Sequence, residues 1–116
     1  MLLMTSGRAS AFFEDDILLV GLAASSPAPN EFALSVEGYS VDPYSIMLPK
    51  GDAEFKKLVD GVLVDLFRSS EINRIYDRWF MKPIPPKNIT LNFPMGAALK
   101  NAIAKPTDSA DPADYK

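Results

Sequence analysis

The sequence of 116 residues contains no cysteine and no histidine. These two absences exclude a disulfide framework, a cysteine nucleophile, a histidine general base, and metal sites built from thiolate or imidazole ligands. Acid–base chemistry would have to rest on carboxylates, lysine or tyrosine. We therefore predict no catalytic residue, no metal ion and no other cofactor.

Long apolar runs and an excess of basic charge are also missing. No stretch approaches the roughly 18 apolar residues of a membrane span, and the start, Met1 to Arg8, lacks the pattern of a signal peptide. Twelve basic and fifteen acidic residues give a net charge of -3, which argues against a nucleic-acid partner. The remaining composition, 47% hydrophobic and 23% charged, is typical of a soluble globular protein.

An acidic cluster, Glu14-Asp15-Asp16, separates the first two predicted elements. Residues 9–13 are short and partly apolar and predict a strand. Residues 17–24 predict a helix whose first turn carries the carboxylates, a position that suits both N-capping and the helix dipole. Pro27 and Pro29 end that helix.

Two more strands are predicted from apolar residues that alternate with period two. A connector rich in Gly, Ser, Asp and Pro, residues 38–43, lies between them. The alternating residues are Phe32, Leu34 and Val36 in the first strand, and Tyr44, Ile46 and Leu48 in the second.

The second half of the chain carries the clearest helical patterns. Apolar residues from Phe55 to Phe67 recur at helical spacing after Asp52, a good N-cap. A second helix begins near Ser69 or Ser70 and ends at Lys82-Pro83. Prolines at 83, 85 and 86 then favour an extended, polyproline-like arm, and a short helix follows at about 97–103.

Three groups of residues allow a functional interpretation beside a structural one. Asp15 or Asp16 would either bind a cationic group such as an ammonium, at the strand-to-helix junction where open α/β folds bind ligands, or only cap the helix. Metal binding by this acidic cluster is a third interpretation, but no other part of the sequence converges on it. Tyr44 would either line a cleft or pack in the core. The aromatic stripe of Tyr76, Trp79 and Phe80 is typical of a core rather than of a ligand platform.

Taken in order, several motifs resemble the C-terminal part of bacterial solute-binding proteins of family 3, which serve polar amino-acid ABC transporters. The run after the aromatic stripe is similar to an arm of the periplasmic glutamate/aspartate-binding members. The motifs are Ser6-Gly7-Arg8-Ala9-x-Ala11-Phe12-Phe13-x-Asp15-Asp16, Tyr44, Lys50-Gly51-Asp52-x-x-Phe55-Lys56-Lys57-Leu58, Ile75-Tyr76-Asp77-Arg78-Trp79-Phe80, and Pro83-Ile84-Pro85-Pro86-Lys87-Asn88-Ile89-x-Leu91-Asn92-Phe93.

The resemblance implies an α/β fold, the C-terminal part of a periplasmic-binding-protein type II fold with an incomplete bilobal architecture. It assigns a role to each segment. The implied segments are the end of lobe 2 (1–37), the hinge connector (38–43), the return strand and two helices of lobe 1 (44–82), and the C-terminal arm and short helix (83–105). The remaining residues, 106–116, carry two prolines and three aspartates with one aromatic residue, and this composition predicts a mobile tail.

The resemblance also implies a binding role for Asp15, which matches the strand-end aspartate that holds the α-ammonium of the amino acid. Asp16 is then its helix-starting neighbour, and Tyr44, a candidate cleft-lining residue, begins the return into the first lobe. Ser45 departs from the glycine that commonly follows this tyrosine. The arginine that binds the α-carboxylate, and its Ser/Thr companions, have no counterpart here, so we expect that this chain alone does not bind glutamate or aspartate.

The implied partners of the full-length parent are an acidic amino acid and ABC permease subunits, and the implied location is the periplasm. We also expect a homo-oligomer, because the two long helices present apolar faces that a larger sheet would cover. Two alternatives stay open. One is a truncated reading frame that acts only as a structural or oligomerising piece, and the other is a dehydratase-like enzyme of the same fold.

Overall fold

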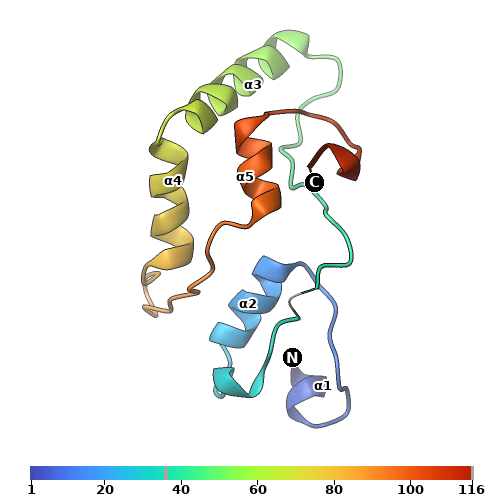
Figure 1. Ribbon diagram of the computed structural model, residues 1–116, viewed down its shortest axis with the longest axis vertical. Coiled ribbons are helices and arrows are strands. Elements are labelled where there is room, and N and C mark those ends of the chain that lie inside the picture. The colour runs from blue at the N-terminus through green and yellow to red at the C-terminus, as the bar shows by residue number, and fades with distance from the viewer. Residues whose placement is uncertain (36, 116) are drawn as a thin grey trace. The chain divides into compact units, whose positions relative to one another are not determined.

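The computed structural model describes residues 1–35 and 37–115 and consists of helices joined by irregular chain (Figure 1). Two compact units are present: Met1–Glu37 with Arg78–Pro94, and Gly38–Asp77 with Met95–Lys116. In chain order the elements are α1 (Leu2–Thr5), α2 (Asp16–Ala24), η1 (Pro29–Glu31), α3 (Ala53–Arg68), α4 (Glu71–Tyr76), the π-helical η2 (Asp77–Met81), α5 (Ala97–Ala104) and η3 (Pro112–Tyr115).

The predicted strands are wrong for this structure, which is rich in helix and shows no strand among its described residues. Residues 9–13, 32–35 and 44–48 are irregular, and Val36 lies outside the described residues. A strand forms only where a neighbouring strand pairs with its backbone N–H and C=O groups and another element covers one of its faces. The physical reason for the difference is that these segments lack such a neighbouring strand within the described residues. The α/β class predicted for this chain is therefore not observed, and the type II architecture stays a prediction.

The first unit contains α2, which begins and ends where the sequence predicts. Asp16 is its first residue, and it stops at Ala24, ahead of the prolines at 27 and 29. The Ser26 hydroxyl accepts the backbone N–H of Ala28 at 3.2 Å, which fixes the turn into η1. Helix α2 contacts η1 in this unit.

The proline-rich segment of the first unit is a closed loop and not the extended arm that its prolines predict. The backbone N–H of Ile84 donates to the carbonyl of Ile89 at 2.9 Å, and these two residues form an isolated antiparallel bridge. The chain reverses through Asn88, whose φ of 53° lies in the left-handed region that asparagine tolerates. Phe93 then donates to the carbonyl of Phe80 at 3.2 Å.

The second unit is organised around α3, which contacts both α4 and α5 (Figure 1). The predicted cap is confirmed, because the Asp52 carboxylate accepts the backbone N–H of Phe55 at 2.9 Å. Helix α4 begins after Ser70, as predicted, and continues directly into η2. The predicted final helix is α5.

Few side chains are buried. Among the described residues only Tyr76 and Tyr115 are buried, each 8% exposed. The apolar stripe of α3 is partly in water, with Leu58 62% and Val62 60% exposed. The prediction that the aromatic stripe lies in the core is confirmed for Tyr76 and wrong for Trp79, which is 47% exposed. The guanidinium carbon of Arg78 lies 5.6 Å from the centroid of the Trp79 ring.

Candidate ligand-binding site

The N-terminus of α2 carries the candidate residue Asp15 at the N-cap position, with φ −56° and ψ 139°. Its backbone carbonyl accepts the N–H of Leu19 at 2.9 Å and so begins the helical ladder. Its carboxylate makes no capping hydrogen bond to the helix. Asp15 therefore occupies the N-cap position through its backbone, and its role as a ligand contact stays a prediction.

The neighbouring carboxylates are engaged locally. Asp16 Oδ1 accepts the backbone N–H of Ile17 at 2.6 Å, and Glu14 Oε1 accepts the backbone N–H of Asp15 at 3.2 Å. All three acidic residues are exposed. A negative charge in the first turn also suits the positive end of the helix dipole. Asp16 thus belongs to the local structure of the helix start, as a neighbour of the candidate ligand contact.

Tyr44 belongs to the second unit, in irregular chain, and is 72% exposed. In the described chain Tyr44 is thus largely open to water. Its role in lining a cleft stays a prediction. Asp15 and Asp16 are adjacent in the first unit, whereas Tyr44 is part of a different compact unit.

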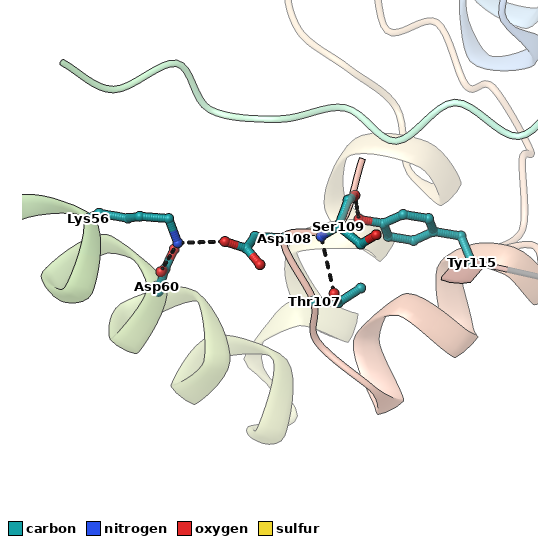
Figure 2. Close-up of polar contacts among 6 residues, drawn as sticks. All are labelled: Lys56, Asp60, Thr107, Asp108, Ser109 and Tyr115. Atoms are coloured by element: carbon teal, nitrogen blue, oxygen red, sulfur yellow. Dashed lines mark hydrogen bonds and ion pairs between the residues drawn. The ribbon is translucent and has the colours of Figure 1, made fainter. Parts of the chain in front are cut away.

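Sequence reasoning missed a charged cluster in the second unit, shown in Figure 2. Lys56 Nζ lies 2.5 Å from Asp60 Oδ2 on the same helix and 2.7 Å from Asp108 Oδ2 in the C-terminal tail. The hydrogen bond to Asp108, and to a smaller extent that to Asp60, raises the pKa of Lys56. The hydrogen bond with Lys56 in turn lowers the pKa of Asp108. The i,i+4 spacing of Lys56 and Asp60 was the only sequence signal for this cluster.

A shallow depression of about 570 Å³ runs along α3. None of the three predicted ligand contacts lies in it. No group of three or more acidic side chains that would hold a metal ion occurs in the described part of the chain. The depression is lined by Ala53, Lys56, Lys57, Asp60, Gly61, Val64, Asp65 and Arg68.

Comparison with known proteins identifies relatives of this chain. The L-glutamate/L-aspartate-binding protein of Pseudomonas aeruginosa is 48% identical over 109 residues, which cover 94% of this chain and 36% of that protein. The glutamate/aspartate import solute-binding proteins of Escherichia coli and Salmonella typhimurium are 38% and 39% identical, over 92% of this chain and 35% of each protein. This chain is a relative of the glutamate/aspartate-binding proteins. No protein-family model matches it.

The resemblance to glutamate/aspartate-binding proteins that the motifs predict is thereby confirmed. The chain spans about a third of the length of these glutamate/aspartate-binding proteins. It corresponds to a portion of such a protein. No helix in the described ranges has the length and apolar character needed to cross a membrane.

Proposed function

We propose that this chain is the C-terminal part of a solute-binding protein that presents glutamate or aspartate to an ABC importer in the periplasm. The carrying observation is the 48% identity that extends over 94% of the chain to a protein named for binding these two amino acids. Two further relatives are named as components of glutamate/aspartate import. All three are named as binding proteins, which favours a non-enzymatic role.

Within this function Asp15 binds the α-ammonium of the ligand. The support is chemical and positional: an exposed carboxylate stands at the N-cap position of α2. A charged hydrogen bond from an ammonium to a carboxylate is among the stronger polar contacts in proteins. Asp16 fixes the helix start beside it, and Tyr44 lines the cleft in the complete protein.

The 116-residue chain alone does not bind the ligand appreciably. Glutamate and aspartate carry two carboxylates and one ammonium, and Asp15 pairs only the ammonium while it repels both carboxylates. A charge that is desolvated without a partner costs several kcal/mol. The family resemblance implies an arginine for the α-carboxylate, and no motif of this chain supplies it.

Isothermal titration calorimetry tests this function with two proteins. The first is the chain itself, and the second is a chimera in which the chain replaces the matching third of the Pseudomonas aeruginosa relative. We expect no heat of binding from the chain and micromolar binding of glutamate or aspartate by the chimera. Micromolar binding by the chain alone would refute its proposed incompleteness, and a folded chimera that binds neither amino acid would refute the proposed function.

The proposed partners follow from the same reasoning. The complete protein docks on ABC permease subunits, because the relatives in Escherichia coli and Salmonella typhimurium are named as import proteins. The chain by itself forms a homo-oligomer, because Leu58 and Val62 keep about three-fifths of their surface in water. This exposure also favours the second candidate role, a structural or oligomerising piece that has no ligand of its own.

A further inference from the structure

The C-terminal segment 105–115 is folded on itself by a series of short turns. The backbone N–H groups of Ser109, Asp111 and Ala113 each donate to a side-chain oxygen two residues earlier, at 3.1, 3.1 and 2.9 Å. Such local bonds satisfy backbone donors where no regular helix or strand does so. The segment therefore has a defined path between α5 and the end of the described chain.

Tyr115 closes this path. Its hydroxyl donates to the carbonyl of Ser109 at 2.7 Å, and it is one of the two buried residues among those described (Figure 2). The short helix that carries it, η3, contacts α5. A buried aromatic ring with its hydroxyl bonded is the usual way in which tyrosine anchors a segment.

The segment has a second attachment, to α3. Asp108 Oδ2 lies 2.7 Å from Lys56 Nζ, which Asp60 also contacts from the following turn of the helix (Figure 2). The side chains of Lys56 and Asp108 are 48% and 74% exposed. An ion pair so accessible to water is weak and is screened by salt.

From these two attachments we propose that residues 105–115 form a C-terminal strap that fastens α3 to α5 and that opens reversibly. The short helix η3, held to the segment by the Tyr115–Ser109 bond, is the salt-insensitive attachment to α5, and the Lys56–Asp108 pair is the salt-sensitive attachment to α3. When the pair breaks, the strap leaves α3 and uncovers Lys56 at the rim of the depression along that helix. The inference concerns the chain itself and stands whether or not the proposed transport function is correct.

Hydrogen exchange of the complete chain, measured by mass spectrometry, tests the strap with a charge swap. Lys56→Glu and Asp108→Lys should each speed exchange across 105–115, by about twofold to fivefold for the loss of one exposed ion pair. The double variant should return the rate of hydrogen exchange to that of the unmodified chain, because an ion pair of opposite polarity then joins the same two positions. Lys57→Glu makes the same charge change one residue away and should leave the segment unaffected.

Two further measurements keep the test decisive if a swapped chain folds poorly. In about 1 M salt, where the screening length is near 3 Å, the unmodified chain should exchange as fast across 105–115 as the single variants. Tyr115→Ala should speed exchange more than either charge variant, because it removes the anchor. If salt and both charge variants leave the exchange rate of 105–115 unchanged, the electrostatic attachment is wrong. If Tyr115→Ala leaves that rate unchanged, the anchor is wrong.

Discussion

The Asp52 carboxylate accepts the backbone N–H of Phe55 at 2.9 Å, and this bond marks the start of the longest helix in the chain. The first turn of a helix leaves backbone N–H groups without intrahelical partners, and a side-chain oxygen at the N-cap satisfies one of them. The exposed stripe of α3 receives little stabilisation from packing, and isolated helices of about this length are marginal in water. The cap therefore has an unusually large share in the stability of α3.

Replacement of this cap is the first prediction. Asp52→Ala should lower the free energy of unfolding by about 1 kcal/mol, whereas Asp52→Ser should stay within a few tenths of a kcal/mol of the original. Thermal unfolding followed by circular dichroism at 222 nm measures both. Asp65→Ala, an exposed site in the last turn of the same helix, is the matched control and should be neutral or slightly stabilising, because Ala is the better helix former and an acidic side chain is unfavourable at a helix C-terminus. Equal losses for Asp52→Ala and Asp65→Ala would show that the cap does not stabilise α3.

Replacement of Asp15 in the chimera with the Pseudomonas aeruginosa relative is the second prediction. Asp15→Asn keeps the size of the side chain and removes the charge that pairs the ammonium. Loss of one partner of a buried charged pair costs about 2 kcal/mol or more, so the Kd for glutamate should rise by about 30-fold or more. Titration calorimetry gives this value directly.

The neighbouring acid provides the control for that measurement. Asp16→Asn makes the same chemical change at a carboxylate that accepts the local backbone N–H of Ile17, and it should change the Kd by less than about threefold. If the two variants lose affinity equally, the effect comes from the charge of the cluster as a whole, and the specific role proposed for Asp15 is wrong.

Helix positions were accessible from the sequence because they depend on local signals. Asp52 predicted the start of α3 through its capping carboxylate, and Ser70 predicted the start of α4. The carboxylates before Ile17 likewise predicted the start of α2. These signals act within one turn of the chain, so they hold whatever the chain packs against.

The predicted strands and the charged cluster depended on non-local partners. Tyr44 and Ile46 alternate as a strand would, yet a strand needs a neighbouring strand, and none pairs with them within the described residues. The Lys56–Asp108 contact joins residues far apart in the sequence, so no spacing rule reveals it. Asp15 was found as a candidate from the pattern, but its specific role came from the family resemblance.

The titration of Asp108 is the third prediction. The hydrogen bond and charge of Lys56 lower the pKa of this carboxyl from its ordinary value of 3.8. A lowered folded-state pKa means that the pair stabilises the folded chain above pH 3.8 and that this contribution is lost as the pH falls through the folded pKa. The raised pKa of Lys56 keeps its ammonium charged throughout this acid range. The strap should thus hold at neutral pH and release in strong acid.

Carbon-13 chemical shifts of the Asp108 carboxyl, followed against pH, measure this directly. The midpoint in the unmodified chain should lie below 3.8, and Lys56→Gln should move it up toward that value. Lys57→Gln removes the same charge from the adjacent position and should leave the midpoint nearly unchanged. An Asp108 midpoint that is the same in the unmodified chain and in Lys56→Gln would exclude the ion pair in solution.

Self-association through the exposed face of α3 is the fourth prediction. Leu58 and Val62 lie one turn apart on this helix, 62% and 60% exposed, and burial of such side chains against a second copy removes apolar surface from water. Light scattering at micromolar concentration should show an oligomer for the unmodified chain and a monomer for Leu58→Gln with Val62→Gln. Lys57→Gln with Asp65→Gln changes the same number of residues on α3, leaves those two apolar side chains in place, and should stay oligomeric. A monomeric unmodified chain would mean that these side chains remain in water in solution too, and the proposed homo-oligomer would be wrong.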